Sequence, residues 1–379
     1  MTTLHVCNAK IWTGDPARPF ASSLTIEDGR VSTIDAPHAG EPILDCQGDF
    51  VTPGLIDAHM HLALGGETLA QTDLSTASCR DEFESRLAAA HRALPPGQWL
   101  IANGWSETQL GCAPDQTWIR TCEDRPTVCW RMDLHAAIVN QAVLDQLDLP
   151  DDETIARAGG RIGRHDDGRP NGELVEQAAW QHLIPAIPEA PVQTRRDALL
   201  AATRHCLKLG LTTVRTMEYR KVLQEVIEPV RQNLHLRCAI VLLDRTLPLD
   251  LDWIKTFAQD DRLWITGCKS FLDGTIGSRT ARVHEAWLDR PGDRGELVEL
   301  ALADQLDEWQ RHVHAHGLDT AVHAIGDEAV SIALALHEAS LGESRCIIEH
   351  AELVRDEDLS RTAGALLSMQ PLHRAADAP

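Results

Sequence analysis

The chain has 379 residues, 43% of them hydrophobic, which is enough for one large α/β domain and a smaller lobe. It carries 57 acidic and 35 basic residues, and the net charge of −22 argues against nucleic-acid and membrane partners because it repels phosphate groups. The 10 cysteines include no Cys-x-x-Cys pair, and the N-terminus lacks a basic segment followed by an apolar one. We therefore expect reduced thiols in a soluble, cytoplasmic protein.

The first fifty residues predict a small β lobe. Short runs typical of strands alternate with turns there, and Asp28-Gly29 between two such runs is a hairpin signal. We assign residues 1–54 to this lobe and residues 55–379 to the main domain.

An apolar run from Val51 leads to two histidines one residue apart, His59 and His61. Residues i and i+2 of a strand point to the same face, so both imidazoles can reach a single ion. The chain contains 18 histidines, so such a pair also arises by chance. The pair indicates a metal site only together with further ligands.

The next hundred residues are harder to interpret. A helix is predicted over 82–94 and strands over 99–105 and 127–132. The stretch from about 105 to 190 is irregular and rich in Asp, Gly, Pro and Trp, with a loop predicted over 161–172. We interpret residues 95–190, approximately, as an insertion over a scaffold.

From residue 192 onwards helices and strands alternate. Repeated βα units with short connections predict a parallel sheet, and their number favours a barrel over an open sheet. The predicted helices cover 195–209, 222–232, 251–259, 300–316 and 329–341, and the predicted strands include 211–216, 236–243, 263–273 and 365–369.

Two of the later strands end in histidines, His323 and His350. The carboxyl ends of barrel strands meet at one mouth, so three strands bring four imidazoles to one centre. Neutral imidazoles suit zinc, and a water near such an ion ionises around neutral pH and becomes a nucleophile. The pattern therefore predicts a metal centre at the barrel mouth.

Lys269 is open to two interpretations. It lies on the fourth strand, counted from the strand of His59, and His323 and His350 lie on the fifth and sixth. Desolvation in this apolar strand would lower the pKa of Lys269, and a neutral amine can capture carbon dioxide as a carbamate that bridges two ions. Alternatively, its ammonium group faces solvent or pairs with Asp273.

Five stretches, in this order, resemble the amidohydrolase superfamily, and more narrowly its amidohydrolase-3 branch of YtcJ-like metal-dependent hydrolases. The resemblance implies a metal-dependent (β/α)8 barrel beside a β-sandwich lobe, with one or two zinc ions and a carboxylated lysine on the fourth strand. Its usual reaction is hydrolysis of amide or other C–N bonds. The stretches are Thr52–His61, Lys269–Ala281, His323–Asp327, Glu349–His350 and Ser368–Pro371.

Further residues are candidates for roles in the site, and His135 lies in a region that the family places near the substrate. Beyond the metal ligands His59, His61, Lys269, His323 and His350, the candidates for catalysis are Lys269, His323 and Asp377, and those for substrate binding are His135, Trp105 and Arg279. Glu176, Asp327 and Glu352 are candidates to hold ligand imidazoles, although an ordinary ion pair or helix cap is the simpler interpretation. Trp105, Trp118 and Trp130 form either an apolar substrate wall or core.

The sequence departs from the family at its end. Relatives carry an aspartate after the eighth strand, which binds the first metal and acts as general base, and then a segment that completes the β lobe. Here Asp377 follows the seventh strand too closely to match that pattern well, so we expect a barrel without its eighth strand, as a fragment or as a short chain.

Three functions remain open at this stage. The first is a metal-dependent amidohydrolase that cleaves a C–N bond of a small molecule. The second is a truncated, catalytically impaired barrel that keeps its metal, and the third is a metal-dependent deaminase or isomerase on the same fold, because fold does not fix the reaction. Self-association into a homo-oligomer is compatible with each of them.

Overall fold

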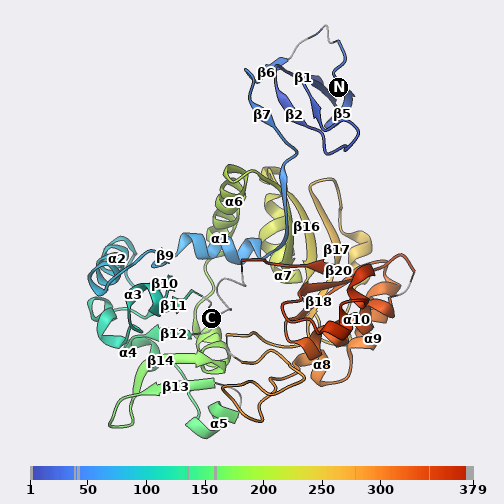
Figure 1. The fold of residues 1–379 in the computed structure, drawn as a ribbon. Coiled ribbons are helices and arrows are strands. Elements are labelled where there is room, and N and C mark those ends of the chain that lie inside the picture. The colour runs from blue at the N-terminus through green and yellow to red at the C-terminus, as the bar shows by residue number, and fades with distance from the viewer. Residues whose placement is uncertain are drawn as a thin grey trace.

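The computed structural model describes residues 3–37, 40, 43–132, 134, 136–157, 160–277, 279–340 and 342–372. Two of the candidate site residues, His135 and Asp377, lie outside these ranges. The described chain forms an N-terminal β lobe, an inserted sheet with its own helices, and a large α/β unit (Figure 1). Within the described ranges no helix combines the length and apolarity that a membrane span needs.

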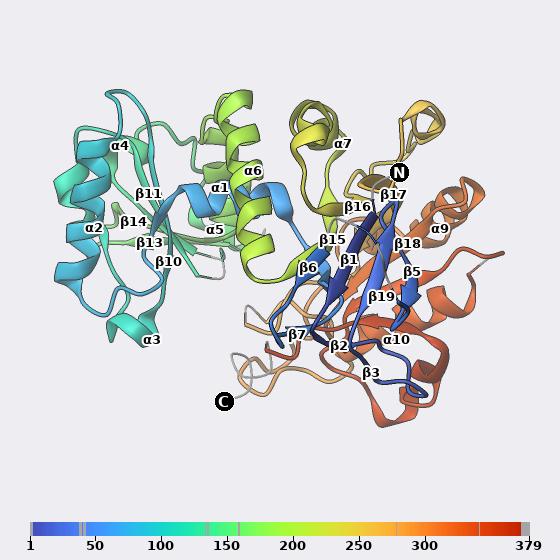
Figure 2. The same cartoon turned by 90° about the horizontal axis from the view of Figure 1, so that it is seen from above.

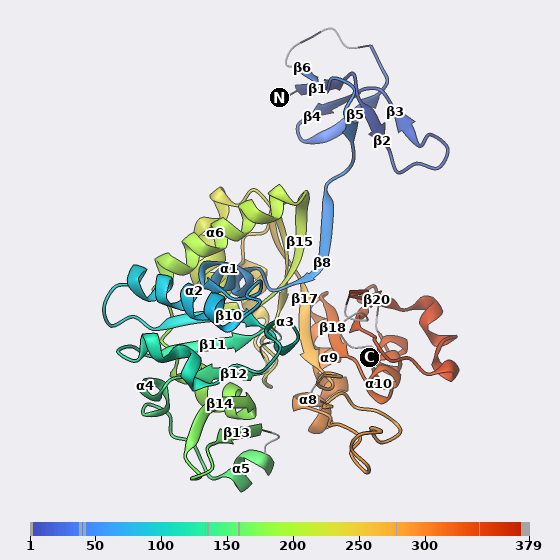
Figure 3. The same ribbon diagram turned by 60° about the vertical axis from the view of Figure 1, so that its left-hand side comes forward.

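The N-terminal lobe consists of two small sheets, with strand orders β5-β4-β1-β6 and β3-β2-β7. The predicted hairpin is present: Glu27 pairs with Arg30, and Asp28 and Gly29 between them both have positive φ angles, as a tight hairpin turn requires. The lobe stands apart from the rest of the chain and continues into it through β8 (Leu55–Met60) (Figure 3). Its strands are β1 (Thr3–Cys7), β2 (Lys10–Trp12), β3 (Phe20–Ala21), β4 (Leu24–Glu27), β5 (Arg30–Ile34), β6 (Ile43–Asp45) and β7 (Phe50–Val51).

The insertion is built on a six-stranded mixed sheet with the order β13-β14-β12-β11-β10-β9. The prediction of irregular structure beyond residue 105 was therefore wrong, and the predicted loop over 161–172 is largely the hairpin of β13 and β14. Glycines interrupt the alternation of side chains that would have indicated these strands; Gly172 has a φ of 92°, and a Cβ there would lie 2.3 Å from the carbonyl oxygen of Val139. The strands are β9 (Thr72–Asp73), β10 (Leu100–Trp105), β11 (Thr127–Arg131), β12 (Ala136–Val139), β13 (Gly160–Arg164) and β14 (Pro170–Glu176).

The main unit is a curled sheet of seven parallel strands with the order β20-β19-β18-β17-β16-β15-β8. Each strand after β8 pairs with the preceding strand of this sheet, β15 with β8 across the insertion, which is the arrangement of a nearly closed α/β barrel. The prediction of a parallel α/β barrel is confirmed at this level. The strands after β8 are β15 (Leu211–Glu218), β16 (Arg237–Leu242), β17 (Leu263–Phe271), β18 (Asp319–Ala324), β19 (Cys346–His350) and β20 (Leu366–Ser368).

Helices cover the outside of the barrel and flank the insertion (Figure 2). In α10 the acidic residues Asp327 and Glu328 occupy the first turn, where the helix dipole favours them, and Val330 and Leu334 turn towards the sheet. The α-helices are α1 (Leu62–Ala70), α2 (Arg80–Ala93), α3 (Glu107–Leu110), α4 (Gln141–Leu144), α5 (Asp152–Arg157), α6 (Val192–Lys208), α7 (Arg220–Val222), α8 (Glu299–Leu302), α9 (Leu306–Ala315) and α10 (Asp327–Glu338). Short 3₁₀ or π segments cover Gln116–Cys122, Ala178–Leu183, Ile184–Ala186, Leu223–Ile227, Glu228–Asn233, Asp252–Thr256, Asp356–Asp358 and Arg361–Gly364.

Candidate metal centre

Four strands bring the five candidate metal ligands together. The ring centroid of His59 lies 6.0 Å from that of His61 and 4.8 Å from that of His350, which is 4.6 Å from His323. The Nζ atom of Lys269 lies 3.4 Å from Nε2 of His59. Lys269, His323 and His350 stand on β17, β18 and β19, the fourth, fifth and sixth strands of the barrel sheet.

A backbone feature brings His350 into this group. Successive residues of a strand point to opposite faces, yet Glu349 and His350 both contact His59. The strand ends with two residues in the left-handed region, His350 at a φ of 75° and Ala351 at 49°. Such conformations cost roughly 1–3 kcal/mol each in a non-glycine residue and are typical of functional sites. The end of β19 thus supplies both a candidate ligand and a carboxylate to the same space.

Protein groups orient the imidazoles, and at His61 the group is the backbone of Met217. Nδ1 of His59 lies 2.6 Å from Oε2 of Glu349, Nε2 of His323 lies 2.9 Å from the carbonyl oxygen of Gly274, and Nδ1 of His350 lies 2.5 Å from Oε1 of Gln370. In each ring one nitrogen is held by an acceptor, so metal binding would use the other one.

Burial lowers the pKa of basic groups in the cluster. It lowers the pKa of His61 to about 4 and that of His323 to about 3, and the neighbouring Lys269 acts in the same direction. Burial also lowers the pKa of Lys269 to about 8, although Glu349 opposes this, and only 1% of Lys269 is exposed. The imidazoles of His61 and His323 are therefore neutral at neutral pH, the form in which they bind metal.

Glu349 is the one strongly acidic group of the cluster. Its burial alone would raise its pKa, but the hydrogen bond from His59 and the cation of Arg215 lower it to about 2. The Arg215 guanidinium binds the second carboxylate oxygen, Oε1, and also donates to the carbonyl oxygen of Ala58 at 3.3 Å. Sequence reasoning missed Arg215; the signal was a cation in the middle of an apolar barrel strand, on the side that faces the interior.

The residues fit a divalent ion by chemistry and spacing. Ring centroids about 5 Å apart are roughly what imidazoles sharing one tetrahedral ion at about 2.1 Å would show. The ligand atoms do not yet point to a common ion. Across the described residues no three His, Cys, Asp or Glu side chains are arranged to hold a metal ion. The spacing of the rings, rather than the present direction of their nitrogen atoms, supports the site.

The structure does not place the ammonium group of Lys269 in solvent or in an ion pair with Asp273. Lys269 is buried, and Asp273 instead accepts hydrogen bonds from the backbone N–H groups of Ile325, Gly326 and Arg282. Asp273 thereby fixes the chain that follows β17 next to His323, whose Nε2 lies 3.7 Å from its Oδ1.

The carboxylates that support the imidazoles differ from those expected. Asp327 accepts a hydrogen bond from the backbone N–H of His284 at 2.8 Å, so it anchors that segment instead of a ligand imidazole. Glu349 takes the expected role towards His59. Roles for Glu176, at the end of β14 in the insertion, and for Glu352 stay predictions.

Trp105 and Arg279, the two substrate-binding candidates within the described residues, form no hydrogen bonds with the candidate metal ligands. Trp105 is 1% exposed in the core of the insertion and donates its indole N–H to the carbonyl oxygen of Cys129, so its assignment to the substrate is corrected. Trp118 and Trp130 are buried in the insertion as well. Arg279 binds Asp289 and the carbonyl oxygen of Ile276, and within the described residues it forms no hydrogen bond with the five candidate ligands.

The fold resembles that of a protein of known structure. The chain is similar to an uncharacterized metal-dependent hydrolase from Pyrococcus horikoshii OT3, with a TM-score of 0.76 and 26% sequence identity, over 99% of this chain and 76% of that one. The fold and the cluster thus define the class of barrel hydrolases that use a metal. Residues 43–378 match the model of the amidohydrolase family, so the protein belongs to the amidohydrolase family.

Two relatives agree with this assignment. The chain is 29% identical to "Protein LONG AFTER FAR-RED 3" of Arabidopsis thaliana, over 99% of this chain and 69% of the relative. It is 30% identical to "Putative amidohydrolase YtcJ" of Bacillus subtilis (strain 168), over 89% of this chain and 65% of the relative. The chain spans about two thirds of the length of these relatives. Family membership supports a hydrolase that depends on a divalent metal.

Proposed function

We propose that the protein hydrolyses an amide-type C–N bond of a small molecule, with His59, His61, His323 and His350 as ligands of zinc. The observation that carries this proposal is the convergence of these four rings and Lys269 at one place in the barrel. A bound divalent ion would polarise the scissile carbonyl and lower the pKa of a water molecule next to it.

The residues of the chain have separate tasks in this proposal. Glu349 accepts a hydrogen bond from Nδ1 of His59 and thereby leaves Nε2 of that ring to bind metal. Arg215 holds the Glu349 carboxylate in place and keeps it ionised. Lys269 has the lowered pKa that carbon dioxide capture requires, and its carbamate would bring an anionic oxygen next to His59 and allow a second ion.

Metal analysis combined with an amide-hydrolysis screen tests the proposal. We expect purified protein to carry stoichiometric zinc, and both His59→Ala and His350→Ala to lower zinc content and the release of amine from amides. His91→Ala, which changes a histidine paired with Asp124 in the insertion, is the matched control and should keep its zinc. Equal zinc in the wild type and all three variants would remove His59 and His350 from the site.

Identification of the products decides between reactions on the same centre. Amine and carboxylic acid in equal amounts indicate amide hydrolysis. Ammonia from an aminated ring indicates a deaminase, and a rearranged substrate without uptake of water indicates an isomerase.

A further inference from the structure

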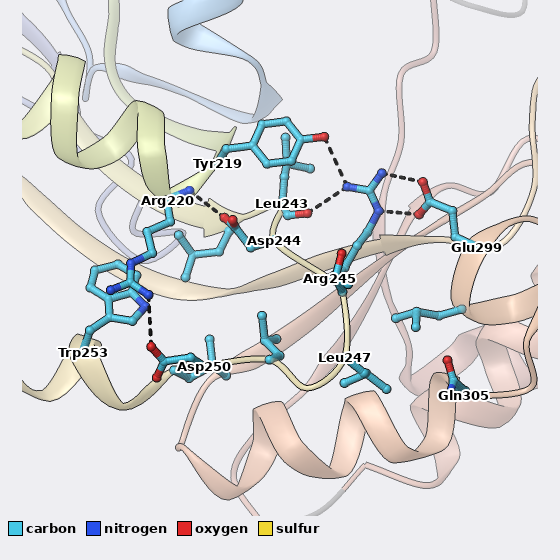
Figure 4. A pocket seen from close by; sticks show the side chains of 15 residues that line it. Tyr219, Arg220, Leu243, Asp244, Arg245, Leu247, Asp250, Trp253, Glu299 and Gln305 are labelled. Atoms are coloured by element: carbon cyan, nitrogen blue, oxygen red, sulfur yellow. Dashed lines mark hydrogen bonds and ion pairs between the residues drawn. The ribbon is translucent and has the colours of Figure 1, made fainter. Parts of the chain in front are cut away.

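A second feature of the barrel is a cavity of about 610 Å³ beyond the carboxyl ends of β15 and β16. Its volume is within the range of small-molecule sites. The chain from Leu243 to Leu251 and the beginning of α8 enclose it, with side chains pointing inwards from both (Figure 4). Its apolar lining is aliphatic for the most part, with Leu242, Leu243, Leu247, Leu249, Leu251 and Leu300 beside the aromatic rings of Tyr219 and Trp253.

One aromatic ring, Phe271, contacts both the wall of the cavity and the candidate metal centre. The guanidinium of Arg245, in the cavity wall, lies 4.9 Å from the ring centroid of Phe271. The same ring lies 4.8 Å from Nζ of Lys269 and 5.3 Å from the ring of His323. The cavity is therefore a neighbour of the candidate metal centre.

The charges in the cavity wall do not balance. Arg245 is neutralised by Glu299, which binds it through two nitrogen atoms, and it also contacts the hydroxyl of Tyr219 and the carbonyl of Leu243 (Figure 4). Arg220 is stacked on Trp253 and pairs with Asp250 at 3.1 Å. Both cations of the wall are thus already paired.

Asp244 is the remaining charge. Its Oδ2 accepts the backbone N–H of Arg220 at 2.5 Å, and within the described part of the chain it forms no ion pair. The cavity therefore presents an aliphatic lining and one uncompensated carboxylate at its edge. An anionic ligand would have to displace Glu299 or Asp250 from its arginine, whereas a cation would complete the charge balance.

We propose that this cavity binds the variable part of the substrate and that this part is an aliphatic chain ending in an ammonium group, which pairs with Asp244. The statement that this ligand is part of the substrate rests on the proposed function of the metal centre. Binding of the aliphatic ammonium ligand itself depends only on the cavity.

Three probes of equal length but different charge test the binding: hexylammonium, 1-hexanol and hexanoate, titrated calorimetrically into the zinc-loaded protein. We expect hexylammonium to bind most tightly and Asp244→Asn to weaken it about tenfold, the order of a hydrogen bond to a charged group, while the affinity for hexanol stays the same. Asparagine keeps an acceptor for the Arg220 N–H, so loss of folding is not expected. Asp261→Asn, on an exposed residue at the opposite end of β17, is the control and should change neither affinity.

A second variant reverses the preference. Asp250→Asn frees the Arg220 cation, so hexylammonium should bind more weakly and hexanoate more tightly than in the wild type. Equal binding of hexylammonium and hexanol by the wild type, or an unchanged preference in Asp244→Asn, would overturn the proposal.

Turnover separates this inference from the proposed function. The wild type should hydrolyse 6-aminohexanamide with a higher kcat/KM than heptanamide, a chain of equal length, and Asp244→Asn should remove the difference. Hydrolysis of both amides at equal rates overturns the inference and leaves the proposed function standing. A protein that binds hexylammonium through Asp244 but holds no metal overturns the proposed function and leaves the cavity assignment standing.

Discussion

His59 and Glu349 are 290 positions apart in the sequence, yet Nδ1 of the imidazole lies 2.6 Å from a carboxylate oxygen inside the barrel. The contact joins β8, the first strand of the sheet, to β19, the sixth, and Arg215 on β15 completes it. Because the sheet curls, its first and sixth strands come close enough for Glu349 to orient His59, a candidate metal ligand.

The first prediction concerns this carboxylate. Glu349→Gln should weaken zinc binding by about 10- to 100-fold, the usual effect of losing a carboxylate that orients a ligand imidazole, and it also leaves Arg215 buried without its anion. Competition with a chelator of known affinity measures the change. Glu338→Gln, which breaks an ion pair with Arg361 on the surface, is the control, and zinc affinity equal in both variants would contradict the role of Glu349.

The second prediction concerns Lys269. Because burial lowers its pKa to about 8, we expect a carbamate when the protein is loaded with zinc in the presence of ¹³C-labelled carbon dioxide. The carbamate carbon signal should be absent from Lys269→Ala, which should also hold fewer metal ions. Lys255→Ala, on an exposed lysine next to Asp252, should retain both. An unmodified Lys269 in fully zinc-loaded protein would contradict the prediction.

The third prediction concerns Glu218 and pH. This buried carboxylate accepts hydrogen bonds from the backbone N–H of Ala63 and the hydroxyl of Thr216, and burial raises its pKa from 4.5 to about 7. Its stabilising effect is thus complete below the unfolded pKa and is lost as the pH rises through about 7. Glutamine stays neutral, so Glu218→Gln should gain stability relative to the wild type as the pH is raised.

Thermal unfolding midpoints between about pH 5 and pH 8 measure this gain. The two proteins should be similar at the acid end and differ most at the alkaline end. Glu308→Gln, on the exposed side of α9, is the control. A difference between Glu218→Gln and wild type that does not vary with pH would show that Glu218 is not the titrating group.

The fourth prediction follows from the correction to Trp105. Trp105→Phe removes the hydrogen bond to Cys129 and should lower the free energy of unfolding by about 1–2 kcal/mol without changing zinc content. Trp12→Phe, on the exposed surface of the lobe, should be close to neutral. A change in KM for amides at unchanged stability would instead return Trp105 to the substrate site.

The sequence was a good guide to the barrel because each βα unit carries its own local signals. The positions of Lys269, His323 and His350 on successive strands follow from that regularity. The carboxylate that orients His59 could not be predicted in the same way. Strand alternation places Glu349 and His350 on opposite faces, and only the left-handed backbone at His350, which has no sequence signal, brings both inwards.

The insertion shows a different limit. β12 is a run of four apolar residues, and β13 and β14 contain glycines, so these strands lack the alternation that identifies a half-buried strand. Trp105 was a substrate candidate because it belongs to a group of tryptophans that could form an apolar wall, but the same residue type also fills cores. Burial, which decides between these roles, is a property of the folded chain.

The neighbouring positions of Glu349 and His350 limit how this segment can change during evolution. A substitution alters one of the two residues, but the insertion or deletion of a single residue within β19 would shift both at once, because strand register is shared. The candidate ligand and the carboxylate that orients His59 would then be lost in one step. Variants of this strand should therefore tolerate changes of side chain far better than changes of length.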